Sequence, residues 1–223
     1  MEFFGPPTIQ KIFQSQPVRF SAATDSGREG WAVALSRPAN MRNAPQVGSD
    51  CSDVYDWAKR QGGADAGESK LLLAAQGQRR RDIAITNMRA KIVRRYPIPT
   101  SAEVICPTAG EGVVIGVGLD LDSQNPVAKV IDDSGNLKEA YFSGRYVTLA
   151  EHEITTFNVV ATAKRYAYDW VLEVEILEDG KRGVVTVRDG DKPFRTAPYS
   201  AKYSQRYEWA IFSSPPSLIG SPG

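Results

Sequence analysis

The chain has 223 residues, of which 42% are hydrophobic and 24% charged, a composition typical of a folded globular protein that can bury a complete core. Lys and Arg number 27 and Asp and Glu 26, so a net charge of +1 excludes a global attraction to nucleic acid or to an anionic membrane. No apolar run is long enough to span a membrane, and residues 1–7 lack the basic and apolar regions of a signal peptide.

The first predicted elements are two strands and a helix. Apolar and β-branched residues bounded by Gly, Pro or Asp predict strands over residues 18–22 and 31–35. Between about residues 50 and 61, apolar residues recur at helical spacing, and two glycines follow. Acidic residues lie near the start of this segment and Lys59 and Arg60 near its end, as the helix dipole favours. The sequence therefore predicts one short helix over about 50–61.

The middle of the chain predicts strands only. Short apolar runs broken by Gly, Pro, Asn or Asp predict strands over 70–75, 82–93, 103–106, 113–121, 140–148 and 155–164. Short strands at this spacing are typical of a sandwich or a barrel.

The clearest strand lies near the C-terminal end. Trp170, Leu172, Val174 and Ile176 alternate with a second, more polar set, which predicts a half-buried strand with Trp170 between two sheets. The pair Asp179-Gly180 suits a tight hairpin turn, and residues 184–188 supply the returning strand.

We therefore predict an all-β fold, an antiparallel β-sandwich with one short helix at about 50–61. Residues 1–14 are expected to form a flexible or edge segment, and residues 15–197 the β-sandwich domain. Residues 198–223 are expected to be a mostly disordered tail, because Ser, Pro and Gly dominate its end.

Few residues predict chemistry. His152 is the one histidine, and it lies between Glu151 and Glu153, which indicates a solvated strand end rather than a catalytic or metal site. Asp120 and Asp122 lack the glycine and the bidentate glutamate of a calcium loop, so a turn is the better interpretation. The glycines at 110, 112, 116 and 118 do not have the spacing of a dinucleotide site. The sequence predicts no cofactor and no metal.

A basic segment is the most prominent local feature. Seven basic residues against Asp82 give residues 79–95 a charge of seven minus one, or +6. They are Arg79, Arg80, Arg81, Arg89, Lys91, Arg94 and Arg95. One interpretation is a strip that binds a polyanion such as nucleic acid. The favoured interpretation is a solvated strand face whose basic side chains pair with acidic neighbours.

The two cysteines, Cys51 and Cys106, allow two interpretations. They are either two buried thiols or one disulfide. A bond would close a loop of more than 50 residues, for which chain entropy gives about 4 kcal/mol, and it would persist only in an oxidising compartment.

Several short blocks resemble a family. Gly30-Trp31-Ala32-Val33, residues 82–89 and residues 189–196 resemble recurring blocks of actinobacterial (Streptomyces-type) membrane-anchored proteins with an extracytoplasmic β-domain. The resemblance spans roughly residues 15–197, and no block is a catalytic signature. It implies an N-terminal membrane anchor and an extracytoplasmic location, but no established activity.

The expected function is a non-catalytic binding or interaction module of the cell envelope, with another protein as its partner and contact with a membrane only through an anchor. The alternatives are a hydrolase that uses paired carboxylates, such as Asp120 with Asp122 or Glu151 with Glu153, and a polyanion-binding protein that uses residues 79–95. A cytoplasmic location is the alternative to the extracytoplasmic one.

Overall fold

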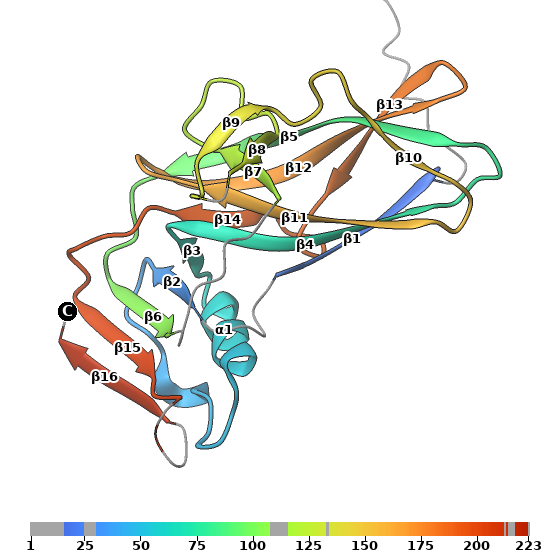
Figure 1. Ribbon diagram of the computed structural model, residues 1–223. Coiled ribbons are helices and arrows are strands. Elements are labelled where there is room, and N and C mark those ends of the chain that lie inside the picture. The colour runs from blue at the N-terminus through green and yellow to red at the C-terminus, as the bar shows by residue number, and fades with distance from the viewer. Residues whose placement is uncertain are drawn as a thin grey trace, which may run out of the picture.

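The computed structural model describes residues 16–24, 30–107, 116–132, 134–211, 213 and 217–222 (Figure 1). Within these residues the chain is mostly β-strand, with a single α-helix, α1, at Cys51–Arg60 and a 3₁₀ turn at Met41–Asn43. The predicted all-β class with one short helix is confirmed. The predicted N-terminal segment 1–14, Gly110 and Gly112 lie outside the described residues.

The strands follow one another along the whole described chain. They are β1 Val18–Thr24, β2 Trp31–Leu35, β3 Ala64–Ala66, β4 Glu68–Gly77, β5 Ile83–Tyr96, β6 Ala102–Cys106, β7 Val117–Asp120, β8 Lys129–Ile131, β9 Leu137–Ala140, β10 Val147–Leu149, β11 Ile154–Thr162, β12 Ala167–Glu178, β13 Lys181–Val187, β14 Phe194–Ala197, β15 Gln205–Trp209 and β16 Leu218–Pro222.

These strands form two sheets. The six-stranded sheet has the order β1-β4-β11-β7-β8-β9, and the ten-stranded sheet has the order β10-β5-β12-β14-β3-β2-β6-β15-β16, with β13 also paired to β12. Most pairings are antiparallel, but β7 with β11, β3 with β14 and β6 with β15 are parallel. Both sheets are therefore mixed rather than purely antiparallel.

The strands of the ten-stranded sheet are divided between two regions of the molecule. In the facing-sheet region, β10, β5, β12, β13 and β14 lie across from the six-stranded sheet (Figure 1). In the helix-backed region, β3, β2, β6, β15 and β16 extend beyond that sheet, and α1 covers one face (Figure 1). Gly67 links the two sheets between β3 and β4: its N–H donates to Ala197 O (2.6 Å), and its carbonyl accepts from Ala163 N (3.2 Å).

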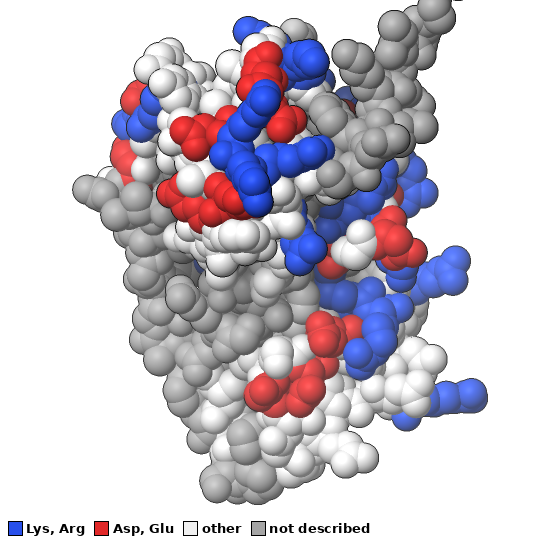
Figure 2. Space-filling model, turned by 90° about the vertical axis from the view of Figure 1, so that its right-hand side faces the viewer, with Lys and Arg blue, Asp and Glu red and all other residues white. Residues whose placement is uncertain are grey.

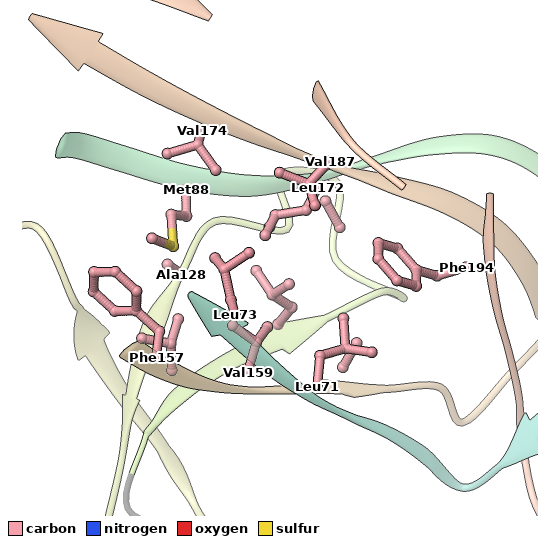
Figure 3. Packing of buried hydrophobic residues seen from close by; sticks show 14 of the residues in the cluster. Leu71, Leu73, Met88, Ala128, Phe157, Val159, Leu172, Val174, Val187 and Phe194 are labelled. Carbon is pink, nitrogen blue, oxygen red and sulfur yellow. The ribbon is translucent and has the colours of Figure 1, made fainter. Parts of the chain in front are cut away.

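The core of the facing-sheet region is apolar. Trp170, Leu172 and Val174 are almost completely buried, which confirms the predicted inner face of β12. Figure 3 shows side chains of β4 and β11 pointing toward those of β5 and β12 across this core, among them Leu73, Phe157 and Met88. The prediction that β12 is only half-buried is wrong, because its other face, which carries Asp169 and Glu173, is buried too. Basic side chains from β5 and β14 lie over that face.

The helix α1 begins and ends as the sequence predicts. Asp50 caps its first turn, since the Asp50 side chain accepts from Asp53 N and the Asp53 side chain accepts from Asp50 N. The buried face of α1 packs on β2 and β6. A Cβ on Gly63, just after the helix, would lie 2.3 Å from Val33 Cγ1, so a glycine allows this close approach of the chain to β2.

The structure differs from two more sequence predictions. The strand predicted over 140–148 is in fact the end of β9, a turn at 141–144 and β10. The segment 198–223 was expected to be mostly disordered, but its described part contains β15 and β16. Strand β15 pairs with β6, and Trp209 is buried in the core beside α1, so burial of an aromatic side chain orders this segment.

Candidate functional site

The basic segment 79–95 lies along β5 and the turn before it, and its side chains meet acidic partners. Arg89 Nη2 and Lys91 Nζ lie 2.7 and 3.0 Å from carboxylate oxygens of Glu173. Arg94 Nε lies 3.1 Å from Asp169, which also accepts from Arg195 of β14. The acidic residues of β12 are therefore the partners that the favoured interpretation of this segment requires.

The remaining basic residues of the segment lie toward its ends. Arg79 lies 3.9 Å from a carboxylate oxygen of Glu178, and Arg81 forms an ion pair with Asp179. The Arg95 guanidinium lies 4.5 Å from the centre of the Tyr166 ring, and Arg80 is exposed. Figure 2 shows Lys and Arg side chains interleaved with Asp and Glu over one side of the molecule, rather than gathered in a continuous basic surface.

Three of the four carboxylates proposed for hydrolysis accept hydrogen bonds from backbone N–H groups in turns. Asp122 accepts from Lys164 N at 2.6 Å and from the Tyr168 hydroxyl at 2.5 Å, and Asp120 accepts from Asp122 N at 3.1 Å. Glu153 accepts from Ala150 N at 2.8 Å. These hydrogen bonds stabilise the conformation of the loops. Those of Asp120 and Asp122 agree with the turn that the sequence predicts there.

His152 has the exposed position that the sequence predicts. Its side chain is 79% exposed, and Nε2 lies 4.0 Å from a carboxylate oxygen of Glu151. Its backbone φ of 65° places it in a tight turn, where its N–H donates to Gly77 O. In the described ranges, no three His, Cys, Asp or Glu side chains come together as a metal site would require.

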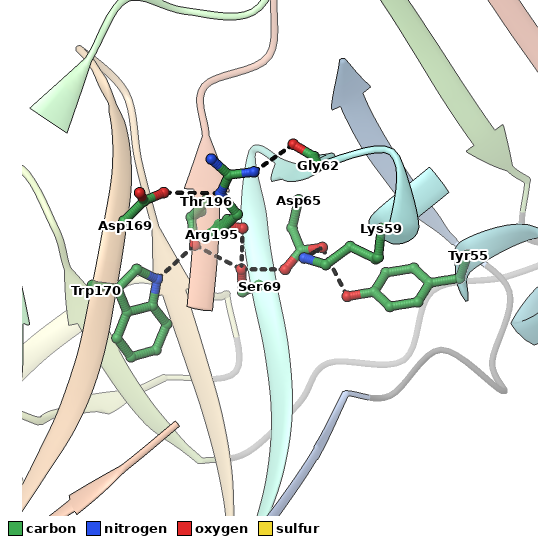
Figure 4. Close-up of polar contacts among 9 residues, drawn as sticks. All are labelled: Tyr55, Lys59, Gly62, Asp65, Ser69, Asp169, Trp170, Arg195 and Thr196. Carbon is green, nitrogen blue, oxygen red and sulfur yellow. Dashed lines mark hydrogen bonds and ion pairs between the residues drawn. The ribbon is translucent and has the colours of Figure 1, made fainter. Parts of the chain in front are cut away.

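A buried chain of hydrogen bonds joins α1 to both sheets (Figure 4). Asp65 of β3 accepts from the Tyr55 hydroxyl (2.8 Å), Lys59 Nζ (2.9 Å) and Ser69 Oγ (2.5 Å). Burial raises the pKa of Tyr55, and the charge of Asp65 raises it further. The Thr196 hydroxyl continues the chain from Ser69 (2.6 Å) to the indole N–H of Trp170 (2.9 Å). This chain braces the two regions against each other from inside the core, where no ligand reaches it.

The best candidate site is an open cleft of about 620 Å³ on the helix-backed region. Its floor consists of Ala32 of β2 and of Glu103 and Ile105 of β6. Because side chains alternate along a strand, these residues face away from α1, whereas their neighbours Val33 and Val104 pack toward it. Residues 199–201 and Arg206 form the sides of the cleft.

A buried ion pair lies in the cleft. Glu103 is 2% exposed, and Arg206 Nε of the neighbouring β15 donates to its Oε2 at 2.8 Å. The parallel pairing of β15 with β6 places these two residues directly opposite each other. Burial raises the pKa of Glu103, and the hydrogen bond and charge of Arg206 offset part of that rise. The other N–H groups of the half-exposed Arg206 side chain can donate to a ligand.

An exposed aromatic ring borders the cleft. Tyr199 is 62% exposed, yet its ring rests against the backbone of Gly67. A Cβ on Gly67 would lie 2.2 Å from Tyr199 Cε2, and Gly67 has a φ of +85°. A side chain at position 67 would therefore both clash with the ring and strain the backbone. The tyrosine ring therefore packs on Gly67 while much of its surface stays open to solvent.

A disulfide lies at the same place in the fold. Cys106, at the end of β6, lines the cleft and is bonded to Cys51 in the first turn of α1, with the two Cα atoms 5.9 Å apart. Of the two interpretations left open by the sequence, the structure has the bond. It fixes α1 to the strand that supplies Glu103 and Ile105 to the floor.

The sequence did not reveal these cleft residues. Tyr199 and Arg206 fall in the segment expected to be a disordered tail, and Glu103 is an ordinary residue of a predicted strand. The recurrence of Tyr199, Tyr203, Tyr207 and Trp209 in this polar stretch was the available signal of order.

Comparison of the chain with protein-family models, with curated proteins and with solved structures found no match. Within the part of the chain that the structure describes, no helix has the length and apolar character needed to cross a membrane.

Proposed function

We propose that the protein is a non-catalytic binding module whose binding site is the cleft bordered by Tyr199 and Arg206. The observation that carries this proposal is that the apolar side chains of Ala32 and Ile105, a buried ion pair and an exposed aromatic ring packed on Gly67 surround one opening. Small-molecule sites have this mixture of mostly apolar walls with a few fixed polar groups, and the cleft volume is within their usual range. Fixed side chains also lose little conformational entropy when a ligand binds.

The proposed location is outside the cytoplasm, at the cell envelope. The disulfide between Cys51 and Cys106 supports it, because protein disulfides form and persist mainly in oxidising compartments. The resemblance to membrane-anchored proteins with an extracytoplasmic domain also supports this proposal.

Mapping with small probes tests the binding site. We expect phenol, acetamide and 2-propanol, each titrated into the ¹⁵N-labelled protein, to shift the amide resonances of the cleft residues most. The variant Ala201→Trp should block these shifts, since Ala201 is exposed and a larger side chain there fills the cleft without entering a core.

The matched control is Ala23→Trp, which enlarges an exposed alanine on β1 of the other sheet. It should leave the probe shifts unchanged. Probes that gather on another surface, or shifts that Ala201→Trp does not reduce, would show that the cleft is not the binding site.

A further inference from the structure

We infer that the cleft binds a neutral saccharide, with one sugar ring stacked on Tyr199 and its hydroxyl groups hydrogen-bonded to the Glu103–Arg206 pair. This inference rests on the proposed function and names the chemical class of its ligand. It replaces the protein partner expected from the sequence.

The ring of Tyr199 offers an aromatic platform at the border of the cleft. The face of an aromatic ring carries partial negative charge, and it attracts the weakly positive C–H groups on the face of a sugar ring. Tyr199 packs on Gly67, and this contact restricts the positions that its ring can take. The apolar side chains of Ala32 and Ile105 continue the platform along the floor. A sugar ring, with an apolar face and a polar rim, matches this surface.

The cleft contains one anionic and one cationic side chain, Glu103 and Arg206. Glu103 and Arg206 neutralise each other, so the pair adds no net charge to the cleft. The half-exposed Arg206 nevertheless presents guanidinium N–H donors, which the buried carboxylate of Glu103 holds in place. Ser200 adds a hydroxyl whose oxygen accepts from Lys202 N at 3.1 Å, which leaves its own hydrogen free to donate. Sugar hydroxyl groups both donate and accept, so they can satisfy this set without bringing in a charge.

An extended peptide cannot pair with the strands of the floor. Strand β2 is paired with β3 on one side and β6 on the other, and β6 is paired with β2 and β15. The backbone groups of the floor are therefore committed to the sheet, and strand addition requires a free edge. Recognition in the cleft must come from side chains.

The test is titration calorimetry of the full chain with neutral tetrasaccharides: chitotetraose, cellotetraose and maltotetraose. We expect at least one to bind, with a dissociation constant that stays the same between about 50 mM and about 500 mM NaCl, because no net charge is neutralised. Tyr199→Ala should weaken binding about tenfold, whereas Tyr199→Phe should stay within about twofold because it keeps the ring. Tyr146→Ala is the matched control, because Tyr146 is also exposed but lies outside the cleft.

Four results would overturn the inference. If no tetrasaccharide binds while small probes still gather in the cleft, the ligand class is wrong and the proposed binding site stands. If a saccharide binds equally well to Tyr199→Ala, the stacking site is wrong. Loss of both saccharide binding and probe shifts in the unmodified protein would contradict the binding site itself. A heparin fragment that binds in the cleft and is released by salt would assign it to polyanions instead.

Discussion

The facing-sheet region and the helix-backed region share one ten-stranded sheet, but they complete their cores in different ways. In the first, apolar side chains from two sheets meet, and Trp170 lies at the interface. In the second, one helix packs on the sheet, and the disulfide from Cys51 to Cys106 joins the two layers. The smaller core buries less apolar surface, so a covalent link contributes more of its stability. The open cleft therefore lies on the helix-backed region, whose layers are joined by a disulfide rather than by a large apolar core.

Each region also buries a glutamate on the outer side of its sheet, with a different number of cations around it. Burial alone raises the pKa of Glu173, but hydrogen bonds from Lys91 and Arg89 outweigh it, and the pKa falls below its ordinary value. Burial raises the pKa of Glu103, and its one cationic partner, Arg206, does not outweigh it. Glu173, with two cationic partners, therefore forms a structural ion-pair cluster. Glu103, with one cationic partner, carries a charge that is less stabilised.

The largest expected effect tests the apolar core of the facing-sheet region. Trp170→Ala removes a side chain that is 0% exposed and a hydrogen bond to Thr196, and should lower the free energy of unfolding by about 3–5 kcal/mol. Urea titration followed by circular dichroism measures this loss. Tyr146→Ala, at an exposed tyrosine, should change stability by less than about 0.5 kcal/mol. An unchanged urea midpoint for Trp170→Ala would contradict the position of β12 in the core.

The second prediction concerns the bond of the helix-backed region. Replacing both Cys51 and Cys106 by Ala should cost about 4 kcal/mol, because the bond joins residues 55 positions apart and restricts the unfolded chain. Amide hydrogen exchange should quicken in α1 and β6 before it changes in β5 or β12. Intact-mass measurement after alkylation, with and without prior reduction, provides the control. Two alkylated thiols in the untreated protein would contradict the bond.

The local patterns of the sequence predict most elements, and long-range pairing explains the misses. The helix and the inner face of β12 follow from the spacing of apolar residues and from the caps, which are local signals. Strand β15 pairs with β16 and also with β6, roughly a hundred residues earlier, and no nearby residue encodes the contact with β6. The ion pair of Glu103 likewise depends on Arg206, which it meets only after folding. The cleft was unpredictable for the same reason.

A smaller effect on stability is expected at Glu173, which has two cationic partners. Glu173→Gln should lower stability by about 2 kcal/mol at pH 7, because the hydrogen bonds from Arg89 and Lys91 lose their charged acceptor. The folded pKa of Glu173 lies below its ordinary value of 4.5, so the carboxylate stabilises the protein above that pH and loses this contribution as the pH falls through the folded pKa. Urea titrations between pH 3 and pH 7 should show a shallower acid slope for Glu173→Gln. An equal slope in both proteins would remove the proposed role of this pair.

The smallest effect, and the sharpest contrast, is expected at Glu103. Glu103→Gln should change stability at pH 7 by no more than about 1 kcal/mol, because the amide still accepts from Arg206 and no longer buries a charge. The pH dependence should have the opposite sign to that of Glu173. Since the folded pKa of Glu103 is raised, its contribution is fully present below the unfolded value near 4.5 and is lost as the pH rises through the folded pKa. Subtracting the Glu103→Gln stability from that of the unmodified protein across this range should therefore give a difference that falls with pH, whereas the same subtraction for Glu173→Gln should give one that rises. If both differences rise with pH, the effect of Arg206 on the pKa of Glu103 outweighs the effect of burial. The buried carboxylates of the two regions would then stabilise the protein in the same pH range.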